Sequence, residues 1–284
     1  MGDDLDSRLS QVSTSEDIDE LIDLGCDLAD ARRLSDAERC FRRAASLGSA
    51  VAEFNLGNTL ADSGRPAEAV AAYERALAGG EAAAWFNLGT ALEDLGDLAG
   101  AMRAFRAAFR AGDAKGALAL AFSLREQGER AAAQVAAREA VEAGDPTAAA
   151  VLACWEWDET GDPALEPALR AGADLYPSAR VDLAQLLVQT GRVGEARAAL
   201  ERGAKLGEAE SWLPLGNLYA DEFDDAAAAE TAYRSGIAAG DTYCHHNLGV
   251  LLLERGADEQ AREQFQLGAD AGDALAARAL RDLH

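Results

Sequence analysis

Aromatic residues and lysine are scarce in this chain of 284 residues. Aromatics make up 6% of the sequence, and only two of its 26 basic residues, Lys115 and Lys205, are lysines. Acidic residues number 50, so the net charge is -24. Such a charge repels a nucleic-acid backbone and an anionic membrane, and we expect neither as a partner. Proteins or peptides of basic or amphipathic character are the partners that this charge favours.

Long apolar runs are absent as well. No segment approaches the ~18–20 consecutive apolar residues that a membrane-spanning helix needs. The first residues, MGDDLDSRLS, are polar and acidic, unlike the basic start and apolar stretch of a signal peptide. The four cysteines are scattered and form no Cys-x-x-Cys pair, which fits a reducing compartment. We therefore expect a cytoplasmic protein, and either a monomer or a homodimer agrees with the sequence.

Residues that carry chemistry are few. The three histidines are His245, His246 and His284. The adjacent pair would point about 100° apart on a helix, whereas a metal site needs ligands on one face, as at i and i+4. No G-x-S-x-G nucleophile motif, phosphate-binding loop or dinucleotide-binding G-x-G-x-x-G motif occurs. We expect no metal, no cofactor and no catalytic residue, so the chain is predicted not to be an enzyme.

Alanine is abundant, with 66 residues, and the sequence repeats itself. Alanine fills helices well and gives a strand little to pack, so this composition favours helices. A Leu-Gly or Leu-Ala pair recurs at spacings of 32, 32, 32, 32, 31, 32 and 33 residues. Equal spacing of this kind is typical of repeat architectures. We call the leucines of these pairs the anchor leucines: Leu24, Leu56, Leu88, Leu120, Leu152, Leu183, Leu215 and Leu248.

Two series of glycines run at the same period. Glycine suits the position just past a helix end, where the backbone turns left-handed without a Cβ penalty. Each repeat is therefore predicted to be a helix, a short turn and a second helix. The first series is Gly48, Gly80, Gly112, Gly144, Gly207, Gly240 and Gly272. The second series is Gly64, Gly96, Gly128, Gly161, Gly191 and Gly256.

Small residues and aromatics recur at fixed places in the repeats. A glycine or alanine follows each anchor leucine, and in most repeats another alanine lies 12 residues further on. Four residues beyond that alanine stands Phe41, Tyr73, Phe105 or Phe265. Small residues let two helix axes approach, and the aromatic ring fills the space between neighbouring repeats. A single repeat cannot bury its apolar face, so the stability must come from stacking.

Two stretches carry a resemblance to a known family. The stretch Trp85–Ala108 begins with Trp-x2-Leu-Gly and continues with Ala, Phe and Ala, and it resembles the tetratricopeptide repeat. The stretch Trp212–Tyr219 repeats the first half of this motif. The Ala-Gly-Asp-Ala links that begin at Ala111 and Ala271 resemble those of the related Sel1-like repeats. The resemblance implies an all-α, right-handed superhelical solenoid of about eight helix-turn-helix repeats of ~32 residues plus a C-terminal capping helix.

The expected organisation has three parts. Residues 1–17 are predicted to form a flexible acidic tail, residues 18–272 the eight repeats, and residues 273–284 the capping helix. Two repeats depart from the pattern, because Pro167 is expected inside the second helix of the fifth repeat and Pro214 inside the first helix of the seventh. A proline in a helix interior costs ~3 kcal/mol or kinks the helix. These departures are either bends in the solenoid or drift in tolerant repeats.

In the families that this chain resembles, the first helices line a concave groove, and asparagines there bind the backbone of a peptide. Residues one before and two after an anchor leucine share a helix face, and asparagine offers both a donor and an acceptor. The resemblance also matches Lys115 to a base that holds a peptide's terminal carboxylate. Alternatively, asparagine merely recurs with an Asn-Leu-Gly consensus. The predicted peptide-binding residues are Asn55, Asn58, Asn87, Lys115, Asn217 and Asn247.

Acidic residues recur on the same predicted face. Most lie six residues beyond an anchor leucine, and one lies directly before it. A groove lined in this way would attract cationic segments and speed their encounter, although charges at helix ends are often simply solvated. The predicted electrostatic residues are Asp62, Asp94, Glu126, Asp158, Asp182 and Asp221.

The function that these patterns favour is a non-catalytic protein-protein interaction scaffold or adaptor. It would hold a peptide, or a basic or amphipathic partner segment, in its concave acidic groove. One alternative is an acidic neutralising partner of a basic protein, of the immunity or anti-regulator type. Another is a regulator that senses a peptide or a small ligand.

Overall fold

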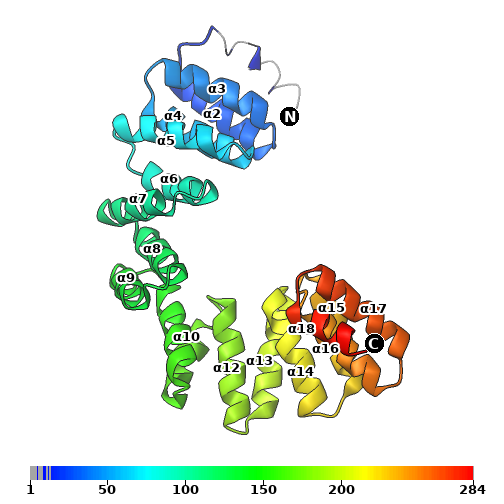
Figure 1. The fold of residues 1–284 in the computed structure, drawn as a ribbon. Coiled ribbons are helices and arrows are strands. Elements are labelled where there is room, and N and C mark those ends of the chain that lie inside the picture. The colour runs from blue at the N-terminus through cyan, green and yellow to red at the C-terminus, as the bar shows by residue number, and fades with distance from the viewer. Residues whose placement is uncertain (1–4, 6–8, 11, 13, 284) are drawn as a thin grey trace. The chain divides into compact units, whose positions relative to one another are not determined.

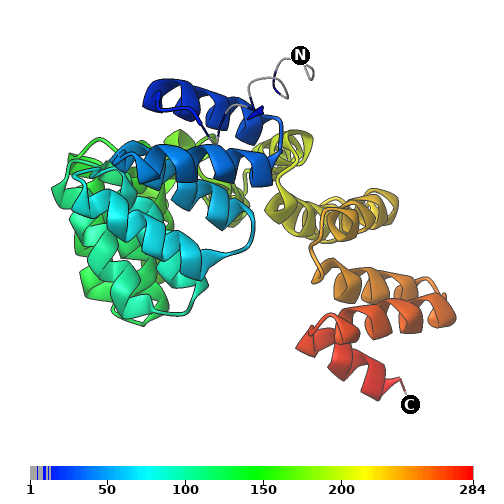
Figure 2. The same ribbon diagram turned by 90° about the horizontal axis from the view of Figure 1, so that it is seen from above.

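The computed structural model describes residues 5, 9, 10, 12 and 14–283. Within these residues the chain forms seventeen α-helices and two short 3-10 helices, and no strand occurs among them. Consecutive helices pack against each other as antiparallel hairpins, as Figures 1 and 2 show for the helices of each part of the chain. The predicted all-α fold of helix-turn-helix repeats is confirmed. The repeats group into two compact units, Met1–Asp145 and Pro146–His284.

The first unit contains the first four repeats. Each repeat is one hairpin, and the first helix of each hairpin also packs against the second helix of the preceding one. Its helices are α2 (Ile18–Asp30), α3 (Leu34–Ser46), α4 (Ala50–Asp62), α5 (Pro66–Ala78), α6 (Ala84–Asp94), α7 (Leu98–Arg110), α8 (Ala114–Glu126) and α9 (Arg130–Glu142).

The second unit contains the remaining four repeats and the last helix, α18, which packs against α17 and α16. Its α-helices are α10 (Ala148–Thr160), α11 (Glu166–Gly172), α12 (Pro177–Gln189), α13 (Val193–Leu206), α14 (Trp212–Asp221), α15 (Ala226–Ala238), α16 (Cys244–Glu254), α17 (Asp258–Asp270) and α18 (Ala274–Asp282). The two 3-10 helices are η1 (Pro163–Leu165) and η2 (Ala209–Ser211).

The helices end where the two glycine series predict. Every glycine of both series has a positive φ, for example 97° at Gly112 and 71° at Gly64. Among the described residues, two others adopt this conformation, Arg32 with φ 58° and Asp224 with φ 50°. Arg32 follows α2, where the first repeat has no glycine, and Asp224 lies in the seventh repeat just before α15. The left-handed turn is therefore kept even where the sequence lacks the residue that favours it.

Buried aromatic rings lie directly on the glycines that follow the anchor leucines. A Cβ atom added at Gly25, Gly57, Gly89, Gly216 or Gly249 would come within 2.3–2.5 Å of a ring carbon. The ring therefore occupies the space that a side chain would need. Repeats without the aromatic carry alanine after the anchor instead. These pairs are Ala121 with Ala137, Ala153 with Leu169, and Ala184 with Leu200, all buried.

The two prolines expected in helix interiors lie at helix starts, so that prediction is wrong. In the fifth repeat, η1 precedes a short α11 that begins at Glu166, which places Pro167 in the first turn. In the seventh repeat, η2 precedes α14, which begins at Trp212 and places Pro214 in the first turn. The amides of a first turn have no partner within the helix, so a proline there loses no hydrogen bond.

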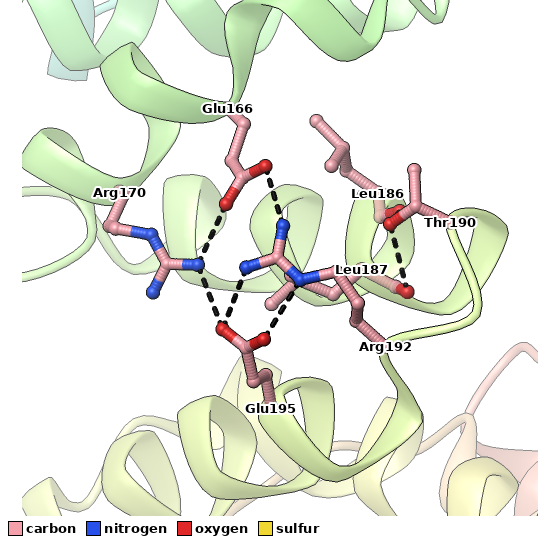
Figure 3. Close-up of polar contacts among 7 residues, drawn as sticks. All are labelled: Glu166, Arg170, Leu186, Leu187, Thr190, Arg192 and Glu195. Carbon is pink, nitrogen blue, oxygen red and sulfur yellow. Dashed lines mark hydrogen bonds and ion pairs between the residues drawn. The ribbon is translucent and has the colours of Figure 1, made fainter.

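A network of charged side chains links the fifth repeat to the sixth (Figure 3). Arg192 donates to both oxygens of Glu195 at 2.8 and 2.7 Å and to Glu166 at 2.7 Å. Arg170 donates to the same two carboxylates, at 2.8 Å to Glu166 and 3.2 Å to Glu195. The hydrogen bonds from Arg192 lower the pKa of Glu195 to about 2. The first two repeats are linked in the same way by Glu38, Arg42, Arg65 and Glu68.

The predicted acidic tail lies partly outside the described residues, which omit 1–4, 6–8, 11 and 13. Of its described residues, Leu9 and Val12 are buried and belong to the core cluster that extends over the first three repeats. The side chain of Arg43 donates to the carbonyl of Ser15 at 2.8 Å. These described residues are therefore packed on the first repeat.

Candidate functional site

Two of the predicted asparagines meet in the first unit. Asn58 lies on α4 and Asn87 on α6, and Asn87 Nδ2 donates to Asn58 Oδ1 at 2.7 Å. The hydroxyl of Tyr73, on α5, donates to the same oxygen at 2.9 Å. Burial raises the pKa of Tyr73 to about 12, so its hydroxyl stays protonated and remains a donor. We call this set the first asparagine cluster.

The second unit contains the same cluster. Asn247 Nδ2, on α16, donates to Asn217 Oδ1, on α14, at 2.6 Å. The hydroxyl of Tyr233, on α15, donates to that oxygen at 2.9 Å. Burial again raises the pKa of the tyrosine to about 12. We call this set the second asparagine cluster.

Each cluster lines an open cleft between two successive first helices. The first cleft, between α4 and α6, has a volume of about 340 Å³, and the second, between α14 and α16, about 390 Å³. Neither cleft is lined by a lysine or an arginine. Both have carboxylates at the same repeat positions. These carboxylates are Asp62 and Asp94 in the first cleft and Asp221 and Glu254 in the second.

The hydrogen bonds within a cluster decide which amide groups can meet a ligand. Asn58 Oδ1 accepts two internal bonds, which occupies both of its lone pairs. In the described part of the chain, Asn58 Nδ2 and Asn87 Oδ1 have no partner, so the cluster offers a donor and an acceptor side by side. This pair matches the carbonyl and the N–H of a peptide backbone.

The two clefts differ at several wall positions, and one of these changes the hydrogen bonds of the cluster. Phe86 lines the first cleft, and its ring centroid lies 5.6 Å from that of Phe105. His246 holds the same repeat position in the second cleft, and its Nδ1 lies 2.9 Å from Asn247 Oδ1. The second cluster therefore offers the Asn217 Nδ2 donor, while the oxygen of Asn247 is engaged.

Two of the predicted peptide-binding residues lie outside the clusters. Asn55 is half-buried on α4, and its backbone carbonyl accepts a hydrogen bond from the hydroxyl of Thr59 at 2.9 Å. Lys115 is exposed in the first turn of α8 and lines neither cleft. The clusters bring together only four of the six predicted residues.

Three of the six predicted electrostatic residues line the asparagine clefts, and three do not. Asp62 and Asp94 line the first cleft and Asp221 lines the second. Asp62 also forms an exposed ion pair with Arg32 at 3.2 Å. Glu126 and Asp158 are exposed and line neither cleft.

Asp182 is half-buried on α12, one residue before its anchor leucine. It accepts a hydrogen bond from the thiol of Cys154, and burial raises its pKa to about 6. The carboxylates of Asp158 and Glu210 add to this rise. Asp182 therefore carries less negative charge near neutral pH than an exposed aspartate.

The role of the cluster tyrosines was not predicted: Tyr73 was expected only as a packing aromatic, and Tyr233 was not singled out. A pattern within the chain identifies them. Where asparagine lies two residues after the anchor, as at Asn58 and Asn217, the ring on the second helix is a tyrosine. Where another residue stands there, the ring is a phenylalanine, as at Phe41, Phe105 and Phe265. The hydroxyl is present only where an amide oxygen can accept its hydrogen bond.

Comparison with known proteins defines the class. The sequence matches the tetratricopeptide repeat family over residues 22–78, 54–115, 162–211 and 181–244, which together cover more than half of the chain. The chain therefore belongs to the tetratricopeptide repeat family. Members stack helical hairpins into extended surfaces that bind other proteins, and they are typically non-catalytic scaffolds. No curated protein matches the sequence.

Solved structures with this fold include Sel1-like repeat proteins. A Sel1 repeat protein from Oxalobacter formigenes is 19% identical with a TM-score of 0.66, over 99% of this chain and 90% of the other. A protective antigen present in uropathogenic Escherichia coli strains, with an SLR fold, is 24% identical with a TM-score of 0.63. The alignment covers 97% of this chain and 66% of that antigen. At these identities the likeness establishes the fold.

Two findings concern the described residues. Among them, none of the helices combines the length and the apolar character that a membrane crossing requires. They also contain no group of three or more His, Cys, Asp or Glu side chains placed to hold a metal ion. All four cysteines are free thiols, with Cys26 exposed and the other three buried.

Proposed function

We propose that this chain is a protein-interaction scaffold that binds extended, basic segments of partner proteins at its two asparagine clusters. The observation that carries the proposal is the duplication of one arrangement, Tyr-Asn-Asn with a carboxylate rim, in both units. Packing alone does not require the tyrosine hydroxyl, because in other repeats a phenylalanine fills the same position.

Backbone recognition and charge attraction have separate roles in this proposal. The free amide groups of the clusters bind the peptide backbone, whatever the side chains of the partner are. The carboxylates of the rims, with a net charge of -24 behind them, attract cationic segments and raise the association rate. We expect the complex to form in a reducing, cytoplasmic compartment, in agreement with the free thiols.

The test of backbone recognition is Asn58→Asp, with Asn55→Asp as the matched control. Aspartate keeps an oxygen that can accept from both Tyr73 and Asn87, replaces the amide NH2 group that would bind the ligand, and adds one negative charge. The control adds the same charge to the same helix outside the cluster. Asn217→Asp is the corresponding variant in the second unit.

The probe is an array of synthetic nonapeptides that range from acidic to basic, incubated with the full chain, followed by fluorescence anisotropy on the tightest binders. We expect basic peptides to bind. We expect Asn58→Asp or Asn217→Asp to weaken binding by ~1–3 kcal/mol, while Asn55→Asp leaves it unchanged. Absence of binding to any basic peptide, or equal binding by all three variants, would overturn the proposal.

The test of charge attraction is Asp94→Lys, with Glu126→Lys as the control. Both carboxylates are exposed at the same repeat position, but only Asp94 lines an asparagine cleft. Asp94→Lys should slow association and reduce its salt dependence more than Glu126→Lys does, because steering is screened within ~8–10 Å at ordinary salt. Equal effects of the two variants would show that only the overall charge matters.

A further inference from the structure

A third cleft in the second unit occupies the same repeat position as the two asparagine clefts, but two of its three cluster positions carry apolar residues. It lies between α12 and α14 and has a volume of about 330 Å³. Gln185, Leu200 and Pro214 hold the positions that asparagine, tyrosine and asparagine hold in the other two clefts. The hydrogen bonds of an asparagine cluster therefore cannot form in this cleft. We call this site the apolar cleft.

The substitutions change what the cleft can bind. Leu200 has no hydroxyl, and Pro214 has neither a side-chain amide nor a backbone N–H, so two of the three cluster positions offer no polar group. Ala184, Val188 and Leu218 complete the apolar part of the lining. The polar part consists of Gln185, Gln189, Asn217, Asp221 and Glu222. The apolar side of the cleft suits an apolar side chain better than a peptide backbone.

The apolar cleft continues into the second asparagine cleft. Asn217 and Asp221, both on α14, line the two clefts, which lie on either side of this helix. Glu222 adds a carboxylate to the apolar cleft and Glu254 adds one to the asparagine cleft. Neither is lined by a lysine or an arginine. A segment that crosses α12, α14 and α16 therefore meets an apolar pocket, then a free amide donor, then carboxylates.

The helix spacing sets the distance between the two side chains that such a segment would use. Packed helices lie about 8–10 Å apart. An extended chain advances about 3.3 Å per residue. Adjacent clefts are therefore about three residues apart along a bound segment, or slightly more, because successive first helices contact each other far less than the two helices of one hairpin do.

We propose that the second unit binds an extended protein segment in which a bulky apolar residue lies about three positions from a lysine or arginine. The apolar side chain occupies the apolar cleft, Asn217 binds the backbone, and the cation lies near Asp221 and Glu254. This inference rests on the proposed function and adds the chemistry of the bound segment.

The first experiment measures binding of the full chain to fluorescein-labelled nonapeptides of alanine, serine and glycine. Each peptide carries one leucine and one lysine, separated by one to six positions in either order. We expect the tightest binding at a separation of about three. Replacing the leucine by serine should weaken that binding about tenfold, because burial of the side chain is lost. Affinities that depend on neither the leucine nor the separation would overturn the inference.

The second experiment uses Pro214→Asn, with Pro214→Ala as the matched control. Both remove the proline ring from the first turn of α14, but only asparagine restores an amide at the cluster position that Pro214 occupies. Pro214→Asn should lose most of the tenfold preference for leucine, whereas Pro214→Ala should keep it. A preference that survives Pro214→Asn would place the leucine elsewhere and overturn the inference.

The two proposals fail in different ways. If Asn217→Asp weakens binding while leucine and serine peptides bind equally, the apolar cleft is not used and the asparagine cluster still is. If Asn217→Asp has no effect on the binding of any peptide, both the proposed function of the second unit and the inference about the apolar cleft fail. The comparison of leucine with serine peptides can be made on the unmodified chain, without any substitution in the protein.

Discussion

The packing of Phe105 against Gly89 predicts that Gly89→Ala changes stability in opposite directions depending on whether the ring of Phe105 is present. Phe105 is 1% exposed, and a Cβ atom added at Gly89 would come within 2.4 Å of Cε1 and 2.5 Å of Cδ1 of its ring. Gly89→Ala gains about 1 kcal/mol of helix propensity but forces the ring to move, which costs ~1–3 kcal/mol. The net effect in the natural chain should be destabilising or close to zero.

Removing the ring should reverse the effect. Phe105→Ala alone should cost ~3–5 kcal/mol, because it empties a fully buried site. In that background the methyl group of Gly89→Ala meets no ring and fills part of the cavity, so the second substitution should stabilise by about 1 kcal/mol. The coupling between the two substitutions should therefore be ~1–3 kcal/mol. The fourth repeat already combines the two alanines, as Ala121 and Ala137.

Urea unfolding of the full chain, followed by far-UV circular dichroism, measures all four members of this cycle. Ala121→Gly is a control, since Ala137 holds the aromatic position of that repeat, and it should show a propensity loss of about 1 kcal/mol. Stability in stacked repeats depends on nearest neighbours, so the loss in Phe105→Ala should first affect the first unit. If Gly89→Ala has the same effect with and without the ring, the close approach of α6 and α7 is not what makes glycine necessary.

Two further predictions concern titrating carboxylates. Asp182 has a pKa raised from 3.8 to about 6, so its contribution to stability is present below pH 3.8 and is lost as the pH rises through 6. Asp182→Asn should therefore stabilise by ~1–3 kcal/mol at pH 8 and have little effect at pH 4, measured by thermal unfolding, and equal effects at both would contradict the assignment. Glu195 has a pKa lowered from 4.5 to about 2, so its contribution is present above pH 4.5 and is lost as the pH falls through 2. Glu195→Gln should lower the melting temperature at pH 7, and the gap to the natural chain should close towards pH 2, whereas a gap independent of pH would contradict the ion-pair network.

The repeats could be predicted because their signals are local. Each helix end is marked by a glycine whose positive φ is a property of that residue and its neighbours, as at Gly64 and Gly112. The same local reasoning failed at Pro167 and Pro214. There, short 3-10 turns before α11 and α14 shift the helix starts, and these turns are not visible in the period of the anchor leucines.

The asparagine clusters were predicted only in part. The spacing of Asn58 and Asn87 from their anchors placed them on one face, and this requires only helical geometry. Which atoms of the two amides remain free depends on the hydroxyl of Tyr73, 15 residues away from Asn58 in sequence. A donor at that distance acts only after the two helices of the repeat have packed.

The sequence by itself determined that this chain is a series of helical hairpins, because capping, helix propensity and apolar spacing act within a few residues. The tertiary structure alone decided how the three clefts between first helices differ. Two have hydrogen-bonded asparagines and one is lined by Leu200 and Pro214. The lining of a cleft comes from three helices of two successive repeats, so its chemistry exists only where stacking brings those side chains together.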